Sequence, residues 1–292
     1  MSQLRPLLTL MRPANLVTAV ADILAGASVA AAVTGDWNAD LSYLALATIG
    51  LYGGGVVFND VFDLDLDRIE RPERALPRGA VSLAEAVLLG ALLLLGGIAF
   101  SLVVSGSSGA IALAVAVLAL VYDARAKHHA VFGPLVMGMC RGGNLLLGVS
   151  LSAVALTQYW WLGLLPVVFI GAITLTSRGE VGGNNKRAIR LAMALDALVA
   201  VALLVLPYYT RAELLPALPF LLFWYLINAE AKMGALADNR PAPVKRAVKT
   251  GVLSLIPLNA CLAASFMGVG TGLQVLLLLP ISILLARFFA VT

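Results

Sequence analysis

The chain has 292 residues, of which 61% are hydrophobic and only 12% charged, and its mean hydropathy is +0.95. Soluble globular domains carry about 25% charged residues, so this composition predicts an integral membrane protein. Its two cysteines, Cys140 and Cys261, both lie in apolar runs. A disulfide framework and a cysteine-based metal site are therefore not expected.

Ten apolar runs are long enough to cross a hydrocarbon layer of about 30 Å, which takes roughly 20 helical residues. They cover approximately residues 15–33, 41–60, 83–105, 108–122, 130–152, 158–178, 188–207, 212–231, 244–266 and 271–289. The ninth is the weakest, because Pro257 and Asn259 interrupt it. The runs are continuous rather than alternating, which excludes a β-barrel. We expect one domain over residues 1–292, an all-α integral membrane bundle of nine to ten transmembrane helices.

The basic residues predict how this bundle is oriented. Lysine and arginine concentrate in every second connection, whereas the intervening loops hold only Arg211. By the positive-inside rule, the N-terminus and the basic connections are cytoplasmic. The net charge of +4 then reflects topology, so a nucleic-acid partner is not expected.

An acidic motif follows the second run: residues 59–79 read NDVFDLDLDRIERPERALPRG. If the helix continues, Asn59, Asp63 and Asp67 share one face, with Asp60 beside them. Like charges at this spacing repel each other unless something positive lies among them. Magnesium, which prefers oxygen ligands and phosphate, fits better than zinc. The alternative is a solvated acidic turn that the following arginines neutralise.

Three further polar segments lie at the same cytoplasmic face: VYDARAK after the fourth run, CRGGNLLLG in the fifth, and TSRGEVGGNNKR after the sixth. Within the membrane, Arg141 and Asn144 require a polar cavity or a partner. Arg141 could instead pair with Asp22 or Asp196 for purely structural reasons. Carboxylates, magnesium and basic residues converging on a membrane cavity would suit a diphosphate with a lipid tail.

These motifs resemble those of the UbiA superfamily of intramembrane prenyltransferases. The acidic motif matches its first aspartate-rich pattern, N-D-x-x-D-x-x-x-D, with an arginine-rich R-P-x-R-x-L-P-x-G tail. MRPANLVTA at residues 11–19 resembles the start of the family's first helix, and YDARAK resembles its Tyr-to-Lys motif. CRGGNLLLG and SRGEVGGN look most like the EboC-type branch. The resemblance covers essentially the whole chain.

The resemblance implies a bundle around a central cavity that opens sideways to lipid, in a bacterial inner membrane or its plastid equivalent. An isoprenyl diphosphate would bind there through Mg²⁺, and a small aromatic or other electron-rich acceptor would attack the allylic cation. The implied metal ligands are Asn59, Asp60, Asp63 and Asp67. The implied catalytic and diphosphate-binding residues are Asp63, Asp67, Tyr122, Lys127, Arg71, Arg141 and Asn144.

One segment departs from the family pattern. A second aspartate-rich motif usually follows the sixth helix, but here that place reads SRGEVGGNNK. Glu180 is its only carboxylate, so it is the remaining candidate metal ligand there, with Asn184 or Asn185 as neutral donors. Arg178 and Lys186 are candidate diphosphate contacts, because a basic side chain could replace a second magnesium ion.

Three functions follow from these observations. The first is Mg²⁺-dependent transfer of a polyprenyl group from its diphosphate to a small acceptor. The second is a non-catalytic or transport module that binds a prenylated or phosphorylated lipid precursor, which the altered second motif would permit. The third is an ion-coupled transporter using Asp22, Asp196 and Arg141.

Overall fold

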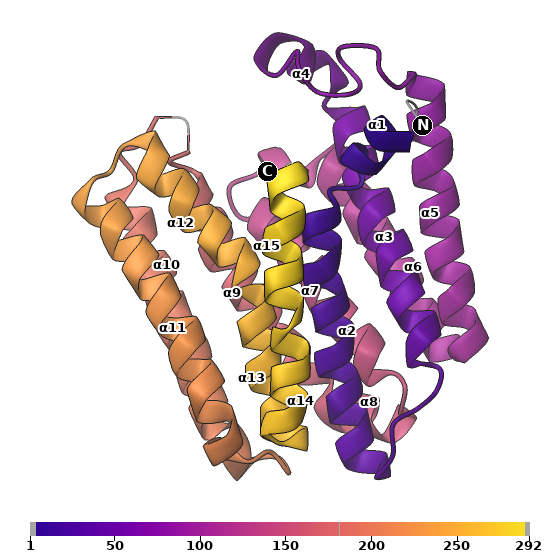
Figure 1. Ribbon diagram of the computed structural model, residues 1–292, viewed down its shortest axis with the longest axis vertical. Helices are drawn as coiled ribbons and strands as arrows, with labels where there is room; N and C mark the ends of the chain where they lie inside the picture. Colours follow the sequence, from indigo (N-terminus) through magenta and orange to yellow (C-terminus); the bar gives the residue numbers. More distant parts are fainter. Residues whose placement is uncertain (1–3, 181, 290–292) are drawn as a thin grey trace.

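The structure is a computed structural model that describes residues 4–180 and 182–289, and the regular elements of this part are all helices (Figure 1). Nine helical stretches of the described chain are long and apolar enough to cross a membrane. The predicted all-α bundle is therefore confirmed, and the chain is an integral membrane protein.

The first half of the chain supplies the first five predicted spans and two short helices near the acidic motif. Its elements are α1 (Leu4–Leu10), α2 (Pro13–Thr34), α3 (Leu41–Phe62), α4 (Leu64–Glu70), α5 (Leu83–Val104), α6 (Gly106–Ala124), the 3-10 turn η1 (Ala126–His128) and α7 (Phe132–Val149). Helix α7 packs against α2, α6 and α9. Its polar residues Arg141 and Asn144 are buried, so they face protein rather than lipid.

The second half supplies the other five predicted spans. Its elements are α8 (Ala153–Tyr159), η2 (Trp160–Gly163), α9 (Leu164–Ser177), α10 (Lys186–Val205), η3 (Leu206–Tyr208), α11 (Leu214–Ala237), α12 (Pro241–Leu253), α13 (Leu255–Met267), α14 (Val269–Leu276) and α15 (Leu278–Phe288). Three spans are each interrupted a few residues before a proline: Pro166, Pro257 or Pro280. Proline lacks the N–H that would continue the helical hydrogen bonds, which accounts for these interruptions.

Glycines let the central helices approach closely. A Cβ on Gly26 of α2 would lie 2.2 Å from the Leu145 carbonyl oxygen of α7, and one on Gly148 of α7 would lie 2.4 Å from that of Ile23. A Cβ on Gly54 of α3 would lie 2.8 Å from Leu94 of α5. The element that contacts Gly148 is thus helix α2.

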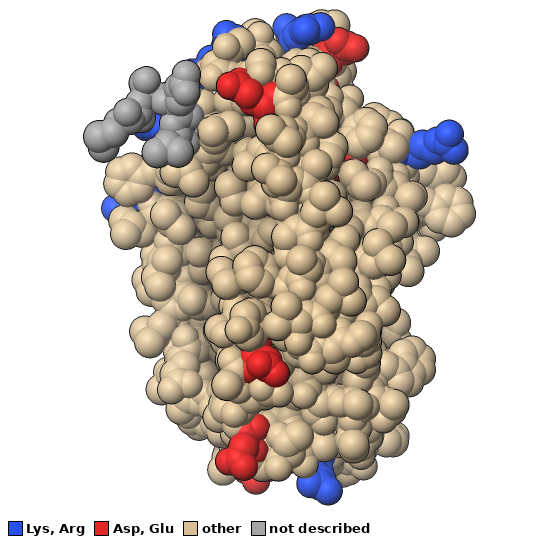
Figure 2. Space-filling model, turned by 90° about the vertical axis from the view of Figure 1, so that its right-hand side faces the viewer, with Lys and Arg blue, Asp and Glu red and all other residues tan. Residues whose placement is uncertain are grey.

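In the view of Figure 1, α10, α11 and α12 lie on the left and α3, α5 and α6 on the right, with α2, α13, α14 and α15 between them. Helices α1 and α4 both lie at the upper end of the bundle in Figure 1, near the upper ends of α3 and α5. On the face drawn in Figure 2, the lysine and arginine side chains lie in the upper part and at the lower tip, acidic side chains lie in the upper part and in the lower half, and most of the surface between is uncharged. This distribution fits a membrane-embedded middle and polar ends.

Candidate functional site

The acidic motif begins on α3 and continues onto α4 after a bend at Asp63. Asp63 has φ −89° and ψ 0°, yet its N–H still bonds the Asn59 carbonyl at 3.0 Å, and the Asp67 N–H bonds the Asp63 carbonyl at 2.8 Å. The four-residue hydrogen-bonding register predicted from the sequence is therefore kept through the bend. As a result, Asn59 and Asp60 lie in the final turn of α3, Asp63 lies at the bend, and Asp67 lies in α4.

Two arginines neutralise Asp60 and Asp67. Arg12, at the start of α2, donates to Asp60 Oδ1 at 2.8 Å. Arg74, in the loop after α4, donates to Asp60 Oδ1 at 3.3 Å and to Asp67 Oδ2 at 2.7 Å. Both aspartates are buried. Arg74 is one of the following arginines that the alternative interpretation expected to neutralise the acids, whereas no role in the site was predicted for Arg12.

Helix α6 and the turn after it complete the cluster. Asn59 donates to Asp123 Oδ1 at 2.8 Å, and Lys127 of η1 forms an ion pair with Asp63. Tyr122 of α6 interacts electrostatically with Asp63 and Asp123. We refer to Asn59, Asp60, Asp63, Asp67 and Asp123 with Arg12, Arg74 and Lys127 as the acid–base cluster.

The donor types of this cluster suit magnesium, which prefers carboxylate and amide oxygens. In the structure, however, each of Asp60, Asp63 and Asp67 directs a carboxylate oxygen to a basic side chain. No group of three histidine, cysteine, aspartate or glutamate side chains in residues 4–180 and 182–289 is arranged as a metal site. Magnesium would therefore compete with the basic side chains for these carboxylates.

Arg141 lies in a separate network within the bundle. It donates to Asp22 Oδ2 at 2.7 Å and to the Thr18 hydroxyl, and it stacks over the Tyr52 ring at 5.1 Å. Asn144 donates to the same Asp22 oxygen at 3.0 Å, and Asn259 donates to the other at 2.6 Å. The pairing with Asp22, which the sequence left open as a structural alternative, is the one observed.

Asp196 does not pair with Arg141. Its partner is Lys232 of α11, and both residues are buried. The predicted span 212–231 ended one residue before Lys232, but α11 continues to Ala237 and buries this lysine. Its pairing with Asp196 could not be predicted, because spacing along the chain does not reveal which helices are neighbours.

Glu180 lies in the loop between α9 and α10. Partial burial raises its pKa above the ordinary value, although the positive charges of Lys245 and Arg71 lower this pKa in part. Arg71 belongs to the loop after α4, so this interaction brings the two predicted motifs together electrostatically. Arg71 itself is exposed.

The other candidates of this loop point elsewhere. Arg178 is exposed and donates to the Ala130 carbonyl, and Lys186 is exposed at the start of α10. Asn185 is occupied: its amide group donates to the Thr176 carbonyl at 2.9 Å, and its oxygen accepts from Asn239 at 3.0 Å. Asn185, a candidate neutral metal ligand, therefore links the α9–α10 loop to the α11–α12 loop.

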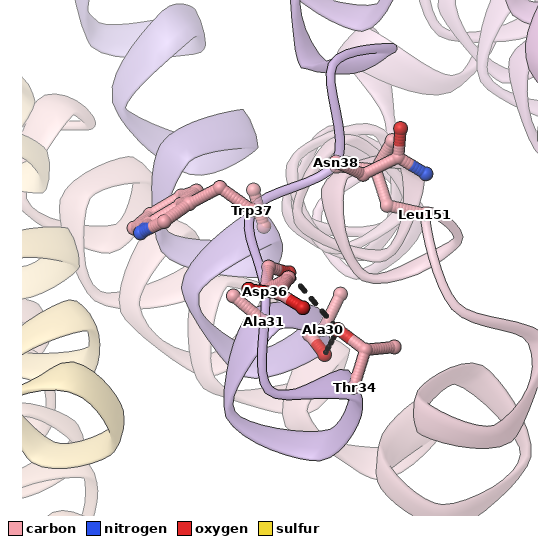
Figure 3. A pocket seen from close by; sticks show the side chains of 8 residues that line it. Ala30, Ala31, Thr34, Asp36, Trp37, Asn38 and Leu151 are labelled. Carbon is pink, nitrogen blue, oxygen red and sulfur yellow. Dashed lines mark hydrogen bonds between the residues drawn. The ribbon is translucent and has the colours of Figure 1, made fainter.

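A pocket of about 190 Å³ lies at the opposite end of the bundle, around the connection between α2 and α3 (Figure 3). Trp37 and Asn38 of the connection, together with Thr34 and Leu151, line it. The acidic motif lies at the other end of α3. This pocket is therefore not part of the acid–base cluster.

The fold and the cluster define a helical membrane protein with paired acids and bases at one end. Its sequence matches the model of the UbiA prenyltransferase family over residues 19–236. The match covers well over half of the chain, and the chain therefore belongs to that family.

Two curated relatives are named digeranylgeranylglyceryl phosphate synthase. The protein of Methanoculleus marisnigri is 35% identical over 49% of this chain and 50% of its own length; that of Ignicoccus hospitalis is 32% identical over 52% and 48%. The chain thus spans about half the length of the curated relatives it matches. They are not named as members of the EboC-type branch.

Solved structures share the fold. A UbiA homolog from Archaeoglobus fulgidus bound to GPP and Mg²⁺ gives a TM-score of 0.68 at 15% identity, covering 92% of this chain and 99% of that one. The apo UbiA homolog from Aeropyrum pernix K1 gives 0.66 at 18% identity, covering 84% and 96%. At these identities the likeness shows the fold alone.

Proposed function

We propose that this chain is an Mg²⁺-dependent prenyltransferase that moves a prenyl group from an isoprenyl diphosphate to an acceptor within the membrane. The observation that carries the proposal is the acid–base cluster. It joins the magnesium-type ligands of α3 and α4 to basic side chains from three other segments. Family membership and the fold shared with a GPP- and Mg²⁺-bound homolog support the same reaction.

The ion pairs suggest how the cluster would work. Asn59, Asp60, Asp63 and Asp67 would hold magnesium, which when bound would stabilise the negative charge of the leaving diphosphate. Arg12, Arg74 and Lys127 would then transfer from the carboxylates to diphosphate oxygens. These three positive side chains would stabilise the negative charge that develops on the diphosphate as its C–O bond breaks.

The remaining predicted residues have weaker geometric support. The positive charge of Arg71 acts on Glu180, so we retain Arg71 as a diphosphate contact and Glu180 as a ligand of a second metal ion. Arg178 and Lys186 would reach the diphosphate only if their exposed side chains turned inward. Arg141 and Asn144 would act from within the bundle, where both donate hydrogen bonds to Asp22.

The acceptor and the setting are also part of the proposal. The resemblance implies an aromatic or electron-rich acceptor, whereas the name of the curated relatives favours testing a glyceryl phosphate acceptor as well. We propose a cytoplasmic acid–base cluster and one functional unit over the whole chain. Assignment to the EboC-type branch stays a prediction.

Pyrophosphate release tests the proposal. Purified protein would receive radiolabelled farnesyl or geranylgeranyl diphosphate, Mg²⁺ and acceptors of both classes. We expect the wild-type protein to release pyrophosphate and the Asp63→Asn substitution to abolish this release. The matched control is Asp65→Asn, because Asp65 lies in the same motif but is exposed and pairs only with exposed Arg68. Tight diphosphate binding without release would instead favour the binding or transport module.

A further inference from the structure

The half of the bundle formed by α9–α12 contains a second group of buried polar side chains. Asp196 of α10 pairs with Lys232 of α11, and Asn228 and Trp224 lie one and two turns before Lys232 on the same face of α11. All four residues are at most 2% exposed. This group is distinct from the acid–base cluster and from the Asp22–Arg141 network.

Three polar atoms of the group have no hydrogen-bond partner among the described residues: Asp196 Oδ1, Asn228 Oδ1 and Trp224 Nε1. The orientation of Asn228 is fixed, because its amide group donates to the Trp224 carbonyl at 2.9 Å and to the Ser254 hydroxyl at 2.8 Å. Its oxygen therefore remains an acceptor.

The Asp22–Arg141 network shows what a protein-satisfied polar group looks like in the same bundle. Both carboxylate oxygens of Asp22 accept hydrogen bonds from buried side chains: one from Arg141 and Asn144, the other from Asn259. Unpaired polar atoms are costly within a membrane bundle, and buried polar groups usually bond to protein or to ordered water. The difference indicates that the α9–α12 group has a partner other than protein.

We propose that Asp196, Trp224, Asn228 and Lys232 form a binding site for a small cluster of internal water molecules. The balance of donors and acceptors selects water. Two acceptor oxygens and one indole N–H need partners, and the Lys232 ammonium carries further donors. The lysine and indole donors disfavour a metal cation, and Asp196 disfavours an anion. Hydration would allow the ion pair to keep both charges inside the bundle.

Radiolytic hydroxyl-radical footprinting of the full chain in lipid nanodiscs tests this site, because radicals formed from internal water oxidise adjacent side chains. Rates would be normalised to those in the unfolded protein. We expect Trp224 to be oxidised several-fold faster, after normalisation, than Phe220, a buried aromatic residue one turn away with no polar atom. Equal protection of Trp224 and Phe220 would overturn the proposal.

Asn228→Leu provides a second measurement through Trp224 oxidation. The substitution also removes the two hydrogen bonds that the Asn228 amide group donates, so a loss of stability is expected in either case. If Asn228 Oδ1 binds water, Trp224 oxidation in the folded variant should fall, and unchanged Trp224 oxidation would contradict the site.

Discussion

Asp60 accepts hydrogen bonds from two arginines on the same carboxylate oxygen, and one of them, Arg12, has φ 48°. A non-glycine residue rarely adopts this left-handed conformation, and such residues often lie at ligand-binding sites. Arg12 comes directly before Pro13, the first residue of α2. The position of this arginine beside the acids thus depends on the junction between α1 and α2.

Arg74 links Asp60 to Asp67, so its removal should have a magnesium-dependent effect. We expect Arg74→Met to lower the free energy of unfolding by about 1–3 kcal/mol, because two buried carboxylates lose a charged partner. Added Mg²⁺ should recover part of this loss by neutralising the acids. Thermal unfolding with and without MgCl₂ measures both effects. Arg78→Met, an exposed change in the same loop, is the control, and an equal effect there would contradict the role of Arg74.

Glu180 should make stability depend on pH. Its pKa in the folded protein is raised above the ordinary 4.5, so the folded state binds this proton more tightly than the unfolded chain does. Stability should therefore fall as pH rises through the window above 4.5. Thermal unfolding of wild type and Glu180→Gln across this window checks the prediction. A parallel pH dependence of the two proteins would show that Glu180 is not responsible.

At the scale of the elements, nine of the ten predicted spans correspond to described helical stretches that are long and apolar enough to cross a membrane, because long apolar runs determine membrane helices almost alone. The remaining span, residues 130–152, corresponds to α7, which is helical but does not meet that criterion. The acidic motif was also predicted, since its four-residue register continues through the bend between α3 and α4. The pairing of Asp196 with Lys232 was not predictable, because it depends on contacts between helices. The same holds for the link between Asn185 and Asn239, which joins two loops 54 residues apart.

The contact between α2 and α7 should depend on the absence of a side chain at Gly148. We expect Gly148→Ala to cost about 1–3 kcal/mol of stability, because its Cβ would lie 2.4 Å from the Ile23 carbonyl oxygen. The control is Gly96→Ala in α5, where nothing lies within 4 Å of the added Cβ. Comparable unfolding temperatures for the two variants would argue against the close contact.

At the scale of the whole molecule, the excess of lysine and arginine predicts orientation. A fluorescent reporter fused after residue 79 or 129 should fold in the cytoplasm, whereas a reporter fused after residue 38 or 105 should lie outside. Alkaline phosphatase fusions at the same positions should give the opposite pattern. Fluorescence after residue 38 would reverse the proposed orientation and place the acid–base cluster on the outer side.

The central claim is that the acid–base cluster binds a magnesium diphosphate. The most direct test is a structure determined with Mg²⁺ and a non-hydrolysable isoprenyl diphosphate analogue. We predict metal density at Asp60, Asp63 and Asp67, with Arg12, Arg74 and Lys127 released from the carboxylates and turned to the diphosphate. An analogue bound elsewhere, with these three basic side chains still paired to the acids, would contradict the claim.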